Sequence, residues 1–278
     1  MTGGGYDPRT HYDHVTDAWS LLLGADLHYG VFDTPTEPLA VATARLTDAM
    51  IEAVRPEPGL SVLDVGCGTG HSACRLAAEQ DVAVLGITPS TIGIHRATAR
   101  AAAAGLSETV RFEARDGMAN GLPDDSTDRV WVLESSHLMR HRDRLISECA
   151  RVLRPGGRIA LCDLMLARPM PFEEVRRLHK PLGTLRDAFG AARMETRDRY
   201  EQLFADNGID VDVSLDLTEA TRPTFDAWRR NAALHEAAVV AQIGRDGLDA
   251  FLASCDILDG FWGDGTMGYG LIAGRLTP

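Results

Sequence analysis

The sequence has no apolar stretch long enough to cross a membrane and no cysteine pair typical of a zinc site. No uncharged apolar run reaches the roughly 20 residues that a spanning helix needs. The first residues, MTGGGYDPRTHYDH, have no basic end followed by an apolar stretch, so we expect no secretion signal. The five cysteines (Cys67, Cys74, Cys149, Cys162 and Cys255) are scattered, odd in number and without a CxxC motif. This usage is typical of buried thiols in a reducing compartment.

Positive charge is also scarce. The chain carries 28 lysines and arginines against 40 acidic residues, a formal net charge of −12. Nucleic-acid phosphates would be repelled by this excess, so a nucleic-acid partner is not expected. We expect a cytoplasmic protein, monomeric or homo-oligomeric, that acts on a small molecule and not at a membrane.

The middle of the chain alternates between short apolar runs and helix-like stretches. Buried strands are expected at 60–66, 82–87, 109–114, 128–134 and 157–164, with two more at 209–217 and 267–276. Helices are expected at 71–80, 89–104 and 146–153. This alternation predicts an α/β, Rossmann-like fold, in which helices cover both faces of a seven-stranded, mostly parallel sheet.

The 278 residues are interpreted as one elaborated domain, 1–278, because a chain of this length can bury a single large core. Its cofactor-binding core is predicted at 55–165 and a helical N-terminal cover at 1–54. The remainder, 166–278, is expected to supply the last two strands and a substrate lid, mostly helical over 170–207 and 222–260.

A glycine-rich loop, VLDVGCGTGHSA (62–73), follows the first strand and opens the first helix. Gly66, Gly68 and Gly70 allow the backbone to turn tightly and to approach a ligand closely. A dinucleotide site would favour the spacing G-x-G-x-x-G, and an acidic residue at the tip of the second strand. Here the spacing is G-x-G-x-G and the strand tip reads GITPS. S-adenosylmethionine fits better than a dinucleotide, because Asp64 can neutralise its ammonium group.

Further motifs follow in order along the chain. Asp116 in EARDGM is placed to accept a hydrogen bond from an adenine amino group, and LPDDSTDRVWVLE and RVLRPGGRIALCD lead into the fourth and fifth strands. Together with the glycine loop they are the signature of class I S-adenosylmethionine-dependent methyltransferases. The chain resembles rebeccamycin-type sugar O-methyltransferases of bacterial specialised metabolism, from YDHVTDAWSLLLGADLHYGVF (12–32) through LES–H (133–137) to GYGLIAGR (268–275).

This resemblance implies that Tyr12, His28, Tyr29 and Gly30 lie over the methionine end of the cofactor. The other predicted cofactor-binding residues belong to the glycine loop and the strand ends: Asp64, Gly66, Gly68, Gly70, Thr88, Asp116, Gly117, Met118, Glu134 and Ser135. The chain departs from the family pattern at three positions: Gly93 replaces a frequent glutamine, Thr127 a phenylalanine, and Leu138 the second of two adjacent histidines.

The stretch LESSHLMRHRDR follows the fourth predicted strand. In an open parallel sheet the ligand lies across the carboxyl ends of the strands, so His137 and Asp163, after neighbouring strands, are expected within reach of each other. We predict that His137 is a general base and that Asp163 orients it or holds the acceptor hydroxyl. The alternative is a histidine that only hydrogen-bonds a loop carbonyl. His141 is assigned to the entry of a helix whose charged residues, Arg140 to Arg144, face water, and no metal site is expected.

Five residues are candidate contacts to the acceptor substrate: Trp19, Arg186, Trp228, His235 and Trp262. Trp262 is expected in a loop because glycines flank it in GFWGDG. The predicted reaction is O-methylation of a hydroxylated metabolite such as a glycoside or polyketide. Alternatives are C-methylation of an aromatic, enol or alkene carbon and a cofactor-binding protein that no longer transfers a methyl group. A prenyl diphosphate acceptor would need a basic cluster, from Arg140–Arg144 or from Arg176 and Arg177.

Overall fold

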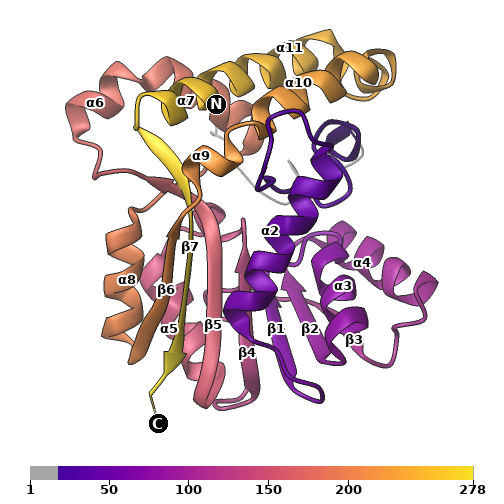
Figure 1. Cartoon of the computed structure of the whole chain (residues 1–278), viewed down its shortest axis with the longest axis vertical. Helices are drawn as coiled ribbons and strands as arrows, with labels where there is room; N and C mark the ends of the chain where they lie inside the picture. Colours follow the sequence, from indigo (N-terminus) through magenta and orange to yellow (C-terminus); the bar gives the residue numbers. More distant parts are fainter. Residues whose placement is uncertain (1–17, 278) are drawn as a thin grey trace, which may run out of the picture.

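The computed structural model describes residues 18–277, which form a seven-stranded sheet with helices on both faces (Figure 1). The strand order is β3-β2-β1-β4-β5-β7-β6. The strands are β1 (Ser61–Val65), β2 (Ala83–Thr88), β3 (Val110–Ala114), β4 (Thr127–Leu133), β5 (Leu153–Leu166), β6 (Ile209–Asp216) and β7 (Met267–Leu276). The first five are parallel, whereas β7 runs antiparallel between β5 and β6. The predicted seven-stranded, mostly parallel sheet is confirmed.

The helices fall into a core group and a roof group. The core helices are α2 (Leu39–Val54), α3 (His71–Gln80), α4 (Thr91–Ala103), α5 (Arg142–Val152) and α8 (Arg197–Asp206). The roof consists of α6 (Phe172–Arg177), α7 (His179–Phe189), α9 (Thr218–Thr221), α10 (Thr224–Leu234) and α11 (Glu236–Gly263). A single 3-10 turn, η1 (Ser136–Leu138), follows β4. No helix within residues 18–277 is long and apolar enough to span a membrane.

Alternation along the strands explains why both faces of the sheet are buried. In β4, Val130 and Val132 point to the face covered by α5 and α8, while Trp131 between them points to the face covered by α2 and α3. All three side chains are fully buried. These successive side chains of β4 thus point to opposite faces, and all three are apolar because helices cover both faces. A continuous apolar run of this kind is typical of a central strand in such a sheet.

Several boundaries differ from the sequence prediction. The helix expected at 146–153 begins at Arg142, and β5 begins at Leu153 rather than at 157. Leu153 already pairs with Thr127 before a register shift, so the RPGG turn belongs to the strand as an irregularity. Trp262 lies in the last turn of α11, and its predicted loop position is wrong.

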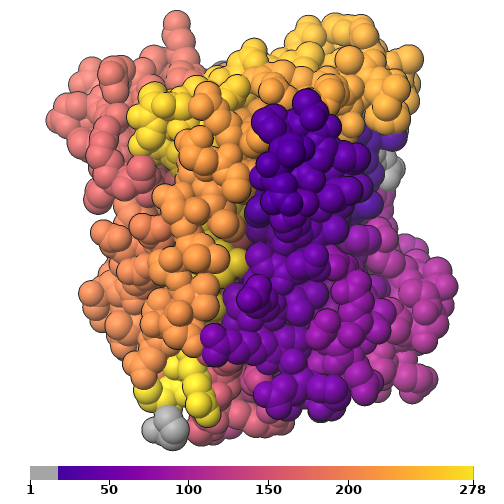
Figure 2. All heavy atoms as spheres, viewed as in Figure 1, coloured from indigo at the N-terminus to yellow at the C-terminus, as the bar shows by residue number. Residues whose placement is uncertain are grey.

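The N-terminal cover reaches the roof across the sheet edge. Residues 18–22 are helical and an irregular segment leads to α2. In this segment Phe32 N donates a hydrogen bond to the Ala220 carbonyl, and Gly30 N donates one to Thr224 Oγ1. In the space-filling view the indigo cover lies directly against the orange residues of the roof (Figure 2). The cover and roof therefore meet above the carboxyl ends of the parallel strands.

Candidate active site

A cavity of about 1180 Å³ lies between the carboxyl ends of the parallel strands and the roof. Its floor is formed by the segments that follow β1, β2, β3 and β4, and its roof includes α7 and the segment 189–194. This volume exceeds the roughly 300–1,000 Å³ usual for small-molecule sites. The cavity therefore has room for two ligands side by side.

The glycine loop forms one wall, and its geometry requires glycine. Gly66, Gly68 and Gly70 all have positive φ angles, of 88°, 52° and 76°. A Cβ on Gly66 would lie 2.1 Å from the Ser135 Cβ, and one on Gly70 would lie 2.6 Å from the ring of Phe112. Gly66 and Gly68 line the cavity, whereas Gly70 shapes the turn into α3 from behind.

Asp64, at the carboxyl end of β1, is a buried carboxylate that lines the cavity. It makes no hydrogen bond or ion pair with any residue of the 18–277 range. Burial therefore raises its pKa to about 7. A cationic ligand group in the cavity would supply the missing counter-charge.

Residues after β2 and β3 form the adjoining wall. Asp116 Oδ1 accepts a hydrogen bond of 2.9 Å from Met118 N, which fixes the turn, and both residues line the cavity. A Cβ on Gly117 would lie 2.7 Å from Val65, so the chain lies flat against β1 here. Thr88, the last residue of β2, completes this wall.

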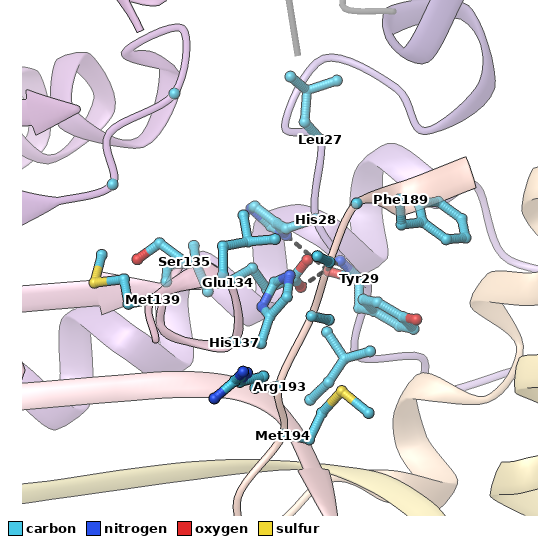
Figure 3. A pocket seen from close by; sticks show the side chains of 18 of the residues that line it. Leu27, His28, Tyr29, Glu134, Ser135, His137, Met139, Phe189, Arg193 and Met194 are labelled. Atoms are coloured by element: carbon cyan, nitrogen blue, oxygen red, sulfur yellow. Dashed lines mark hydrogen bonds between the residues drawn. The ribbon is translucent and has the colours of Figure 1, made fainter. Parts of the chain in front are cut away.

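The cover closes the cavity from the opposite side. Tyr29 N donates to Glu134 Oε1 at 2.8 Å, which ties the cover to the end of β4 (Figure 3). His28 bonds to the Tyr29 carbonyl and to Thr47 Oγ1, and both His28 and Tyr29 line the cavity. Gly30 does not line it but packs against Ala42. Tyr12 lies outside the described residues.

Glu134 occupies a strained position immediately after β4. Its φ is 47°, a left-handed conformation uncommon for residues other than glycine. Burial raises its pKa to about 8, although hydrogen bonds from Tyr269 Oη and Tyr29 N oppose this shift. The adjacent Ser135 donates from Oγ to the Val65 carbonyl at 2.6 Å. The turn between β4 and η1 is thereby fixed against β1.

His137 lies at the centre of the cavity wall and contacts Asp163. Its Nδ1 is 2.6 Å from Asp163 Oδ1, which confirms the predicted contact between the two residues. An ionised carboxylate only accepts hydrogen bonds, so Nδ1 carries the proton. Asp163 is fully buried and its contact occupies Nδ1, so Nε2 is the ring nitrogen left for the cavity that His137 lines. Figure 3 shows the His137 ring among the residues that line this cavity.

Charge in this pair follows from burial and mutual attraction. Burial disfavours the imidazolium, but the charge and hydrogen bond of Asp163 outweigh burial and raise the pKa of His137 above 6.5. The same attraction outweighs burial at Asp163 and lowers its pKa. The main-chain N–H groups of His137 and Leu164 and the hydroxyl of Ser136 also donate to Asp163. These donors keep the carboxylate ionised although it is removed from water.

Comparison with known proteins gives the family. A family model described as "Methyltransferase domain" matches residues 62–157. The 27-O-demethylrifamycin SV methyltransferase of Amycolatopsis mediterranei is 37% identical over 220 residues, covering 77% of this chain and 77% of that protein. The chain belongs to the S-adenosylmethionine-dependent methyltransferases. S-adenosylmethionine is the methyl donor of this methyltransferase.

Two solved structures share the fold. The crystal structure of the cyclase SpnF superposes on this methyltransferase with a TM-score of 0.83 and 26% identity, covering 97% of this chain and 95% of that one. The mycolic acid cyclopropane synthase CmaA1, in complex with S-adenosylhomocysteine, reaches a TM-score of 0.86 at 18% identity, with 96% of each chain covered.

The residues present in the methyltransferase fit its cofactor. The unpartnered, buried carboxylate of Asp64 matches an ammonium group, and the glycine wall leaves the backbone accessible at Gly66 and Gly68. Sequence analysis missed three other polar residues of the cavity, Asp26, His71 and Arg193. His71 pairs with Asp26 of the cover, and Arg193 N donates to the His137 carbonyl at 2.7 Å. All three line the cavity.

The predicted acceptor contacts divide into two groups. Trp19, Arg186 and Trp228 line the cavity. His235 lies between α10 and α11 and does not line it. Trp262 is buried instead in the roof core, where its ring stacks on Tyr29 with centroids 5.6 Å apart. The glycines beside Trp262 did not mark a loop, because α11 accommodates them in its last turn.

The predicted basic cluster for a diphosphate is not at the cavity. None of Arg140–Arg144, Arg176 and Arg177 lines it. His141 is exposed just before α5. Arg142 is buried, and the prediction that this whole run faces water is wrong at that residue. Within the described part of the chain, no three His, Cys, Asp or Glu residues are grouped as a metal site would require.

Proposed function

We propose that the methyltransferase methylates a hydroxyl oxygen of a small specialised metabolite, with His137 as general base and Asp163 as the residue that orients it. The observation that carries this proposal is the 2.6 Å contact between His137 Nδ1 and Asp163 Oδ1 at the cavity wall. It supports the tautomer in which Nδ1 carries the proton, so that in the neutral imidazole Nε2 is unprotonated and faces the acceptor.

The chemistry requires little beyond alignment and removal of a proton. S-adenosylmethionine supplies an electrophilic methyl group on its sulfonium. The cavity walls hold the acceptor in line with that group, and His137 accepts the hydroxyl proton as the bond forms. Asp163 stabilises the imidazolium that results. The strained backbone at Glu134 and the hydroxyl of Ser135 fix the turn that carries the histidine.

The roof side of the cavity indicates the kind of acceptor. Its walls are mainly apolar and include Leu166, Met170, Leu182, Leu185, Phe189 and Met194. Such walls suit a hydroxylated polyketide or similar metabolite with a large apolar surface. One relative is named as a methyltransferase of 27-O-demethylrifamycin SV. That compound is therefore the first acceptor to test, followed by a panel of polyketide and glycoside alcohols.

The test is substitution of the proposed base. His137→Ala is expected to lower turnover of an accepted alcohol by about two to four orders of magnitude, while S-adenosylhomocysteine binding measured by calorimetry stays unchanged. His141→Ala is the matched control, because that histidine is exposed and does not line the cavity. Equal turnover of wild type and His137→Ala would refute the assignment.

The same experiment addresses C-methylation of an aromatic or enol carbon, for which the same base would serve. NMR of the product locates the new methyl group on oxygen or carbon. A product methylated only on carbon, with turnover still dependent on His137, would replace the proposed O-methylation while keeping the base.

A further inference from the structure

Arg142 carries a positive charge in an unfavourable place. It is the first residue of α5, it is 4% exposed, and it forms no ion pair with a described residue. The hydroxyl of Tyr200 is within hydrogen-bonding reach of its guanidinium. A buried charge is costly unless another charge compensates it, and a cation at a helix N-terminus opposes the helix dipole. A compensating anion is therefore required nearby.

The neighbouring hydrogen bonds lead to that anion. Tyr200 on α8 is fully buried, and burial raises the pKa of its phenol, while the nearby guanidinium of Arg142 opposes that rise by its charge and a hydrogen bond. Its hydroxyl is 2.7 Å from Ser136 Oγ, and Ser136 bonds to Asp163 Oδ2. Because an ionised carboxylate can only accept hydrogen bonds, the single hydroxyl hydrogen of Ser136 is donated to Asp163. Tyr200 must therefore donate to Ser136, and both hydroxyl dipoles point toward Asp163.

Other groups also face His137. Asp163 from β5 and Glu134 from the end of β4 favour its protonated form, whereas Arg142 from α5 disfavours it. Arg193 contributes its main-chain N–H to the His137 carbonyl.

The phenols of Tyr29 and Tyr269 adjoin Glu134 and are neutral at physiological pH, because burial raises the pKa of each well above 10. Burial also raises the pKa of Glu134 to about 8, which weakens the effect of its charge near neutral pH. Arg142 and Asp163 are therefore the main opposed buried charges beside the imidazole of His137.

We propose that Arg142, Tyr200 and Ser136 form a buried positioning chain that partly offsets the negative charge of Asp163 and so keeps more of His137 in its unprotonated, proton-accepting form. With a neutral His137, the charges of Arg142 and Asp163 balance. Protonating the imidazole adds an uncompensated positive charge to a buried site, which the positive ends of the two hydroxyl dipoles also oppose. The inference rests on the proposed role of His137 as the base.

Titration of His137 tests the chain without an acceptor. The full-length protein is labelled with ¹³C at the histidine Cε1 atoms, and the His137 signal is identified by its loss in His137→Gln. NMR titrations are then compared for wild type, Tyr200→Phe, Ser136→Ala and Arg142→Met, each with and without S-adenosylhomocysteine. Arg144→Met is the matched control, because Arg144 lies on the same helix but is exposed.

The expected result is an upward shift of the His137 midpoint, by about one unit in Arg142→Met and about half a unit in Tyr200→Phe and Ser136→Ala, with none in Arg144→Met. Phenylalanine has nearly the same shape as tyrosine, so Tyr200→Phe is expected to fold and can still test the proposal if Arg142→Met does not fold. An unchanged or lowered midpoint in folded Tyr200→Phe and Ser136→Ala would overturn the proposal.

Failure of this inference differs from failure of the proposed function. If His137→Ala retains full turnover while Tyr200→Phe still shifts the titration midpoint of His137, the positioning chain exists but His137 is not the base. If His137→Ala loses turnover and the titration midpoints do not move, His137 is the base without this chain.

Discussion

Three buried carboxyl groups at the candidate site have different protonation because their partners differ. Asp64 lacks a partner among the described residues and Glu134 receives two hydrogen bonds, and burial raises their pKa values to about 7 and about 8. Asp163 is at least as buried, but the charge and hydrogen bonds of His137 and the hydroxyl of Ser136 lower its pKa. Unequal surroundings of this kind assign distinct roles to chemically similar groups.

Asp64 is expected to control cofactor affinity. Its folded pKa is raised, so the carboxyl group becomes neutral as pH falls through about 7 and then no longer attracts an ammonium group. S-adenosylhomocysteine affinity should therefore fall below pH 7. Asp64→Asn should weaken binding at pH 8 by about tenfold to a hundredfold and flatten this pH dependence. Calorimetry between pH 5.5 and 8.5, with the exposed Asp246→Asn as control, measures both effects. Unchanged binding by Asp64→Asn would contradict the assignment.

Part of the site could be predicted from the sequence at this scale. His137 follows β4 and Asp163 lies near the carboxyl end of the neighbouring parallel strand β5, so strand order alone brings them together. Arg142 was missed because its charge suggested an exposed position. The spacing of Leu145, Ile146, Cys149 and Val152 nevertheless defines a buried helix face that includes position 142. Tyr200 was missed because only tertiary packing brings α8 to η1.

At the scale of elements, the segments that follow β1 and β4 are in such close contact that there is no room for a side chain at Gly66. Gly66→Ala is expected to prevent S-adenosylhomocysteine binding and to lower the free energy of unfolding by several kcal/mol, about 1 kcal/mol of it from the positive φ. Gly59→Ala is the matched control, because its φ of 82° is similar to the 88° of Gly66 but a Cβ there meets nothing within 4 Å. Denaturant unfolding and calorimetry compare the two. Equal destabilisation with retained binding would show that the clash is relieved.

Element type was easier to predict than element boundaries. Apolar runs such as that of β4 identified the central strands, because both faces of the sheet are covered. Residues typical of turns led to wrong predictions of element boundaries at two places. Pro155 and Gly156 suggested a break, yet they lie within β5, and the glycines around Trp262 lie in or beside α11. Packing overrode the local preference of these residues.

At the scale of the whole molecule, stability is distributed unevenly. Neither α6 nor α7 has a buried residue, whereas the residues of β5 from Gly157 to Asp163 are all buried. Segments with few buried contacts open at low free energy. The roof over the acceptor side of the cavity should therefore open far more readily than the core.

Hydrogen exchange followed by mass spectrometry measures this difference. Amides of 172–189 are expected to exchange at least tenfold faster than those of β5 in the free protein, and to slow when S-adenosylhomocysteine and an acceptor are both bound. Amides of α10, which has several buried residues, are the internal reference for the roof. Protection of 172–189 equal to that of β5 would show a rigid roof.

The position of β7 has a consequence for synthesis on the ribosome. β7 is the last of the seven strands in the sequence, yet it lies between β5 and β6 in the sheet. Its Tyr269 hydroxyl donates a hydrogen bond to Glu134, which is 135 residues away. Until residue 276 has left the exit tunnel, β6 has no neighbouring strand and Glu134 lacks one of its two donors. A nascent chain can form the β3-β2-β1-β4-β5 portion early, but the site becomes complete only after β7 has been translated and inserted.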